Sequence, residues 1–270
     1  MHFNLNVIMA DLAGSLAALV ETPVDPLYYA AIGAGLLKDP TLEVEQVGFL
    51  CPPLYGGDVR LEMCGAEFSS NAARGAAFIA ADRLGKTVGD TLKAEVSGCP
   101  DLLKVEFRED GPWIDMPLAF SIEALEVPIP GRHWPASFPT IHLDGITHVI
   151  ALDEAPDQTL ADNIIHIISK NTDAEAAGVM FLNGTDMRPY VWVRSTDYRV
   201  WEGSCCSGTL AAAIWLSLDS EESPFHVTLY QPGGVLKAEL LKVDSDIISA
   251  RIGGPVSVTK SIVHHLDLDI

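Results

Sequence analysis

A cysteine at the start of an apolar, alanine-rich segment is the feature of this sequence best suited to chemistry. Cys205 follows the small residues Gly203-Ser204 and precedes Cys206-Ser207-Gly208-Thr209 and the alanines 211–213. This pattern predicts a helix that begins next to Cys205. The first turn of a helix carries backbone N–H groups without intrahelical partners and about half a positive charge. Such a position favours the thiolate of a cysteine, which is its reactive form, and the same N–H groups bind carboxylates.

A second segment of the same kind lies earlier in the chain. Ser69-Ser70-Asn71-Ala72 leads into another alanine-rich run. A strand-like segment follows each run, at 103–107 and at 236–240. Turn, helix and strand therefore recur in the same order, which favours two related halves. The alternative is coincidence between two alanine-rich segments.

The composition excludes several classes of protein. The chain has 270 residues, 48% of them hydrophobic, and a net charge of −20. We therefore expect one large or two ordinary globular domains, and the negative charge disfavours nucleic acid or an anionic membrane surface as partner. The sequence contains no uninterrupted apolar stretch long enough for a transmembrane helix, and residues 1–20 lack the features of a signal peptide. Five cysteines without the pattern of a disulfide framework favour a reducing, cytoplasmic location.

Motifs for bound cofactors are absent from the sequence. The Cys and His residues do not show the spacing of a metal site, and there is no glycine-rich motif of a nucleotide-binding fold. We therefore expect neither a metal nor a cofactor.

Sequence patterns also predict the elements that position the two alanine-rich segments. Helices are expected at 25–37 and 159–169 and after each small-polar turn. In the first half, strands are expected around a turn at Gly14-Ser15 and at 44–51, 59–64, 91–96, 102–107 and 113–116. In the second half they are expected at 140–152, 178–182, 190–194, 225–230, 235–243 and 247–252. The proline-rich segment 117–139 predicts a crossover. Each half is thus mostly strands with one central helix, an α+β class without βαβα alternation.

Four short pieces, in the same order, resemble the diaminopimelate epimerase-like superfamily of cofactor-independent amino-acid racemases and epimerases. They are Glu45-Gln46-Val47-Gly48-Phe49, Val96-Ser97-Gly98-Cys99-Pro100-Asp101-Leu102, Trp201-Glu202-Gly203-Ser204-Cys205 and Gln231-Pro232-Gly233-Gly234. Within it, the sequence is most similar to the histidine racemases of opine-metallophore (staphylopine-type) biosynthesis. The resemblance implies two pseudo-symmetric domains, 1–120 (with 259–270 returning to it) and 121–258, each a barrel-like, mostly antiparallel sheet around a central helix. It also implies an active site in the cleft where the two helix N-termini face each other.

In that superfamily two cysteines, one at each helix start, invert the α-carbon of an amino acid. One thiolate removes a proton, and one thiol returns a proton to the opposite face. The family pattern Cys-Gly-Ser/Thr-Gly reads here Cys205-Cys206-Ser207-Gly208, and Cys-Gly-Asn-Gly/Ala reads Ser69-Ser70-Asn71-Ala72. Cys64 is the alternative to Ser69. Because a serine hydroxyl is a weak acid and a poor base without a partner, Ser69 puts full two-base racemisation in question.

The resemblance also implies residues that bind or orient a small amino-acid substrate. They are Asn71, Ser70, Ala72, Cys206, Ser207, Gly208, Thr209, Glu202, Gln46, Ser15 and His148. Glu202 has a structural alternative as a helix cap or surface residue, and His148 has one as a hydrogen-bonded core histidine.

Together these features predict an isomerase that acts at the α-carbon of a free L-amino acid. Cys205 and Ser69 are the catalytic candidates, and histidine is the first substrate to test. The alternatives are a lyase, dehydratase or isomerase that uses one thiol, like the phenazine-biosynthesis relatives, and a non-catalytic protein that binds an amino acid. A homodimer is the assembly that the resemblance implies.

Overall fold

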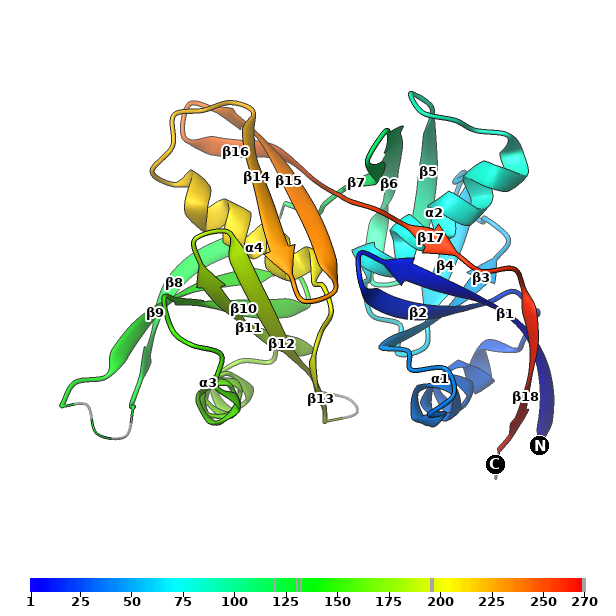
Figure 1. Ribbon diagram of the computed structural model, residues 1–270, viewed down its shortest axis with the longest axis horizontal. Coiled ribbons are helices and arrows are strands. Elements are labelled where there is room, and N and C mark those ends of the chain that lie inside the picture. The colour runs from blue at the N-terminus through cyan, green and yellow to red at the C-terminus, as the bar shows by residue number, and fades with distance from the viewer. Residues whose placement is uncertain (119, 130, 132, 195–196, 269–270) are drawn as a thin grey trace. The chain divides into compact units, whose positions relative to one another are not determined.

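The computed structural model describes residues 1–270 except 119, 130, 132, 195–196 and 269–270. The chain divides into two compact units (Figure 1). Unit 1 comprises Met1–Asp115 and the returning segment Gly253–Ile270, and unit 2 comprises Met116–Ile252. The first segment of unit 1 thus ends before the expected residue 120, and its returning segment begins before the expected residue 259.

Unit 1 is a mixed sheet with two α-helices. Parallel β2 and β3 are joined through η1 and α1, and parallel β4 and β5 are joined through α2. The pairs β1–β2, β3–β4, β5–β6 and β6–β7 are antiparallel, and β17 and β18 both pair with β1. The elements are β1 (His2–Leu12), β2 (Ser15–Val20), η1 (Pro26–Tyr28), α1 (Tyr29–Lys38), β3 (Gln46–Cys51), β4 (Val59–Met63), α2 (Ser70–Leu84), β5 (Thr91–Val96), β6 (Cys99–Arg108), β7 (Gly111–Asp115), β17 (Ser257–Val258) and β18 (Ile262–Asp267).

Unit 2 follows a similar order of elements. Parallel β10 and β11 are joined through α3, and β12 and β14, which also pair in parallel, are joined through β13 and α4. The pairs β8–β9, β9–β10, β11–β12, β12–β13 and β14–β15 are antiparallel. The elements are β8 (Phe120–Val127), β9 (Ala136–Leu143), β10 (Ile146–Leu152), α3 (Gln158–Asn171), β11 (Ala176–Asn183), β12 (Asp186–Val193), β13 (Tyr198–Trp201), α4 (Cys206–Ser217), β14 (Phe225–Gln231), β15 (Gly234–Val243) and β16 (Asp246–Gly253).

One helix in each unit is buried around most of its circumference. α2 packs against β1, β2, β4, β5 and β7, and α4 packs against β9, β10, β11, β14 and β15 (Figure 1). A helix without a polar face belongs in a protein interior, and alanine side chains let the surrounding strands approach it closely. α2 ends at Gly85, which adopts the left-handed conformation (φ +64°) that glycine tolerates best. Each unit therefore holds the first turn of one buried helix in a defined place.

Two expectations about the strands are wrong. The segment 117–139 is not a simple crossover, because it contains all of β8 and the start of β9, which pair as an antiparallel hairpin. Pro128 and Pro135 lie in the connection of that hairpin, where proline costs no ladder hydrogen bond. The structure also contains four helical connections between parallel strands, although the sequence indicated no such alternation. Hydrophobic periodicity indicates that a segment is a strand, but it does not indicate whether that strand pairs in parallel or antiparallel with its neighbour.

Of the helices in the part of the chain that the structure describes, none is both long and apolar enough to cross a membrane.

Candidate active site

Ser69 is the N-cap residue of α2 and is half-buried. Its backbone is extended (φ −132°, ψ 105°), and its Oγ accepts the backbone N–H of Ala72 at 3.1 Å. A capping serine of this kind stabilises a helix by about 1 kcal/mol. The following residues Ser70, Asn71 and Ala72 are buried in the first turn. The structure thus brings these four predicted residues together at one helix N-terminus.

The hydroxyl of Ser69 belongs to a short chain of hydrogen bonds. It donates to Oε1 of Gln46, the first residue of β3, and Nε2 of Gln46 donates to Oγ of Ser15 at 3.2 Å. Ser15 is fully buried at the start of β2. The chain orients the Ser69 hydrogen toward a neutral amide oxygen. Because an amide does not take up a proton near neutral pH, this contact does not activate Ser69 as a base.

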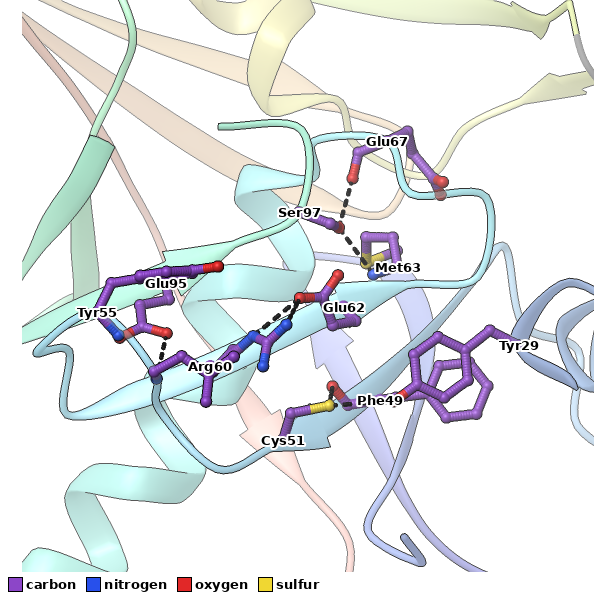
Figure 2. A network of polar contacts seen from close by, with 11 residues as sticks. Tyr29, Phe49, Cys51, Tyr55, Arg60, Glu62, Met63, Glu67, Glu95 and Ser97 are labelled. Atoms are coloured by element: carbon purple, nitrogen blue, oxygen red, sulfur yellow. Dashed lines mark hydrogen bonds and ion pairs between the residues drawn. The ribbon is translucent and has the colours of Figure 1, made fainter. Parts of the chain in front are cut away.

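The β5–β6 hairpin fixes the turn that leads into Ser69 (Figure 2). The Oγ of Ser97 accepts the N–H of Met63 at 2.8 Å and donates to the carbonyl of Glu67 at 2.9 Å. Gly98 has a φ of +71°, and a Cβ there would lie 2.5 Å from the backbone nitrogen of Phe68. Only glycine suits both the conformation and the close approach. The sequence piece 96–102 therefore serves to position the turn before Ser69.

Cys205 occupies the corresponding place at the N-cap of α4. Its backbone is extended (φ −129°, ψ 113°), and its Sγ accepts the N–H of Gly208 at 3.4 Å. The residue is only 5% exposed. In both units the capping side chain thus accepts the N–H of the third residue after it. By this local geometry Ser69, and not Cys64, corresponds to Cys205.

Gln231, the last residue of β14, holds Cys205 in place and is missing from the candidates derived from the sequence. Its Oε1 accepts the N–H of Cys205 at 2.8 Å, and its Nε2 donates to Oγ1 of Thr209 at 3.0 Å. The Thr209 hydroxyl in turn donates to the carbonyl of Cys205 at 2.7 Å. In the following turn the N–H of Gly233 donates to the carbonyl of Gly203 at 2.9 Å. The signal that could have revealed Gln231 was its place in the piece 231–234.

Burial raises the pKa of the Cys205 thiol well above its usual value. The carboxylate of Glu202, in hydrogen-bonding contact with the sulfur, raises the pKa further, whereas the Ser207 hydroxyl and the Gly208 N–H lower it. A buried site disfavours the charged form, and a carboxylate repels a second negative charge. Burial and Glu202 therefore act against the thiolate that a helix N-terminus by itself favours.

His148 lies on β10 and is fully buried. Its Nε2 is 2.9 Å from Oγ of Ser207, and that oxygen is 3.5 Å from Sγ of Cys205. Burial lowers the pKa of His148 to about 3, so the imidazole is neutral. This placement favours the structural alternative, in which His148 is a hydrogen-bonded core histidine.

Asn71 and Gly208 make close contacts within their own units. Oδ1 of Asn71 accepts from Nη1 of Arg74 at 3.2 Å, and the fully buried guanidinium of Arg74 also donates to the carbonyl of Pro112 at 3.0 Å. A Cβ on Gly208 would lie 2.2 Å from Sδ of Met180 and 3.2 Å from Sγ of Cys205. Because glycine has no Cβ, the backbone at Gly208 can lie close to the sulfur atoms of Met180 and Cys205. Cys206, at the first position of α4, is buried beside it.

Cys64 does not occupy the cap of α2, where Ser69 stands. It follows β4, and its N–H donates to the carbonyl of Val47 at 3.0 Å. Its side chain fills the space beside Gly33 of α1, where a Cβ would come within 2.6 Å of the sulfur. Burial and the neighbouring Glu67 raise the pKa of Cys64 to about 12. These contacts describe an inert, packed thiol.

Each unit therefore offers one proton-bearing side chain at the N-terminus of a buried helix. The group is a hydroxyl in unit 1 and a thiol in unit 2. Such groups transfer protons, and the N–H groups of a first helical turn bind carboxylates. Among the described residues, no cluster of three or more His, Cys, Asp or Glu side chains could hold a metal ion.

Solved structures with the same fold define its class. A PhzF-family phenazine biosynthesis protein from Bacillus anthracis matches with a TM-score of 0.68 and 12% identity, over 98% of this chain and 99% of that one. A hydroxyproline epimerase from Agrobacterium vitis, solved with trans-4-hydroxy-L-proline, matches with a TM-score of 0.63 and 12% identity, over 98% and 92%. The α+β class with a mostly antiparallel sheet is thereby confirmed.

The sequence matches the family described as the histidine racemase CntK N-terminal domain over residues 13–261, and the chain belongs to that family. A histidine racemase of Fusobacterium nucleatum subsp. nucleatum is 27% identical over 268 residues, 94% of each chain. A histidine racemase of Staphylococcus aureus is 24% identical over 230 residues, 82% of this chain and 83% of that one. The chain is accordingly an isomerase of the cofactor-independent racemase and epimerase class, as the sequence resemblance predicted.

Proposed function

We propose that the protein racemises a free amino acid, histidine, by proton transfer at the α-carbon involving Cys205 and Ser69. The observation that carries the proposal is the local match between the two caps. Each follows a small-polar turn, precedes a buried alanine-rich helix, and accepts the N–H of the third residue after it. The shared order of elements in the two units supports two related, pseudo-symmetric halves. Histidine is chosen because the similar proteins carry that substrate in their names.

Racemisation breaks the α-carbon–hydrogen bond and re-forms it on the opposite face. In the proposed reaction Cys205, once deprotonated, takes the α-proton of one enantiomer, and the electron pair spreads into the substrate carboxylate. N–H groups of the helical first turns stabilise that charge. The Ser69 hydroxyl then donates a proton to the carbanion, and exchange with water restores the thiolate and the hydroxyl. An α-ammonium group bound by Glu202 would weaken the repulsion that, after burial, raises the pKa of Cys205.

Ser69 also favours a second candidate function. Its hydroxyl donates to a neutral amide and has no titratable partner in that contact. Proton transfer would then be efficient only at Cys205, as in an isomerase or lyase that uses one thiol. Such an enzyme would exchange the α-hydrogen with solvent while it retains configuration, or would release ammonia or water.

Incubation with amino acids in D₂O tests both functions. The α-hydrogen is followed by proton NMR, and the enantiomers are separated by chiral chromatography. We expect the wild-type protein to convert L-histidine into α-deuterated D-histidine. Cys205→Ala should abolish exchange, and Ser69→Ala should slow inversion more than exchange.

Ser217→Ala is the matched control, because Ser217 is a buried serine of the same helix whose hydroxyl donates to the backbone carbonyl of Ile214 at 2.9 Å. This variant should keep wild-type rates. Exchange without inversion would select the one-thiol function. If the wild-type protein exchanged the α-hydrogen of no amino acid at all, both functions would be excluded.

A further inference from the structure

Three side chains of unit 2 form a line that ends at the sulfur of Cys205. The fully buried His148 on β10 reaches Oγ of Ser207 with its Nε2 at 2.9 Å, and Oγ of Ser207 lies 3.5 Å from Sγ of Cys205. All three belong to unit 2, in which α4 packs directly against β10. The proposed reaction gives no role to this chain of contacts from His148 through Ser207 to Cys205.

The direction of the hydrogen bonds in this line follows from the surroundings of His148. A neutral imidazole carries one N–H, on either Nδ1 or Nε2. Nδ1 has no hydrogen-bond partner among the described residues and packs against Gly178 of β11, where a Cβ would lie 2.5 Å away. An orphaned N–H in a protein interior is rare and costly. The hydrogen therefore belongs on Nε2, which donates to Ser207.

The orientation of the Ser207 hydroxyl follows in turn. Its oxygen accepts from His148, so its own hydrogen is directed to Sγ of Cys205, its other hydrogen-bonding neighbour among the residues that the structure describes. The sulfur then receives two donors, this O–H and the N–H of Gly208 at 3.4 Å. Both favour the thiolate over the thiol and oppose the carboxylate of Glu202, the charged group acting on this sulfur.

We propose that His148 and Ser207 are positioning residues that set the acidity of Cys205, with His148 holding the Ser207 hydroxyl as a permanent donor to the sulfur. The imidazole acts as a fixed N–H donor, and it does not store or relay a proton. At the corresponding place in unit 1 stands Asn71, whose amide oxygen accepts from Arg74. Unit 1 thus carries an amide side chain where unit 2 carries the Ser207 hydroxyl. The consequence of the proposed hydrogen bonds for racemisation rests on the proposed function, whereas their effect on the thiol does not.

Titration of the Cys205 thiol tests the proposal without reference to turnover. The ultraviolet absorbance of the thiolate is followed against pH, and the same titration of each protein carrying Cys205→Ala in addition is subtracted. Ser207→Ala and His148→Leu should both lower the thiolate fraction of Cys205 at a given pH by about tenfold, the size expected of one hydrogen bond to a charged group. Ser207→Thr and His148→Gln should restore it, because both keep a donor at the required atom.

Two controls separate this effect from general damage. Ser217→Ala alters a serine of the same helix, and His142→Gln alters a histidine on the adjacent β9 whose Nδ1 is 2.9 Å from Oγ1 of Thr147. Both should titrate as the wild-type protein does. Ser207 is half-buried, so Ser207→Ala should remain folded even if His148→Leu does not. An unchanged titration in Ser207→Ala would overturn the proposal. A shifted titration in a protein that never exchanges an α-hydrogen would overturn only the proposed function.

Discussion

Protonation of His148 should make the free energy of unfolding of this protein fall in mild acid. The folded-state pKa of about 3 lies below the ordinary value of 6.5, because the imidazole is fully buried. Between these two values the imidazole of His148 binds a proton in the unfolded chain but not in the folded chain. The contribution of His148 to stability is complete above about pH 6.5 and decreases as the pH falls toward 3. The slope in that window is about 1.4 kcal/mol per pH unit, which amounts to about 2 kcal/mol between pH 7.5 and pH 5.

Urea unfolding at these two pH values measures the effect, with His148→Gln as the test protein. Glutamine keeps a donor near Nε2 and does not titrate, so the variant should lose about 2 kcal/mol less than the wild-type protein on acidification. The difference between the two losses cancels the titration of other groups. Ser217→Ala, which changes a buried serine of α4 that does not titrate, should lose as much as the wild-type protein. Equal losses in wild type and His148→Gln would refute the reasoning.

Three further predictions concern the two caps. Ser69→Cys supplies a thiol at the first cap and should raise the rate of histidine racemisation, measured by chiral chromatography, by about 100-fold. That factor is the low end for a general acid–base group. An unchanged rate would argue against Ser69 as the counterpart of Cys205. Because the pKa of Cys205 is raised, kcat/KM for the α-hydrogen exchange should increase with pH through the alkaline range, and a profile flat above neutrality would contradict this cause. Gly98→Ala should impair both thermal stability and racemisation through the clash with Phe68, measured by Tm and turnover, whereas Gly56→Ala, at a positive φ with open space around it, should affect stability alone.

The sequence predicted those parts of the fold that depend on local chemistry. The cap of α4 was recognisable because a small residue before an apolar run is a local signal for a helix start. Strand segments such as β3 and β4 were recognisable from their composition and the turn residues between them. Whether two strands pair in parallel could not be predicted, because this depends on which strand lies beside which after the connecting helix.

The candidate site was predictable in its residue types and less so in its electrostatics. Cys205 and Ser69 lie at caps as expected, yet the thiol pKa moves opposite to the direction that a helix N-terminus alone would give. That direction depends on burial by strands distant in the sequence and on Glu202. The roles of Gln231 and of Ser97 likewise arise from hairpins that follow the caps in the chain, and local patterns do not reveal such contacts.

β1 pairs with β18 in a register that sets His2 opposite Asp267 and Val7 opposite Ile262. Strands from the two segments of unit 1 are thus direct neighbours, and unit 2 is inserted in the chain between those segments. During synthesis all of unit 2 is translated before β17 and β18, which are the later partners of β1. In the finished molecule the N–H of Leu268 donates to the carbonyl of Met1 at 2.9 Å. Unit 2 is one continuous segment and can fold before unit 1, whose sheet is completed only when its second segment has been made.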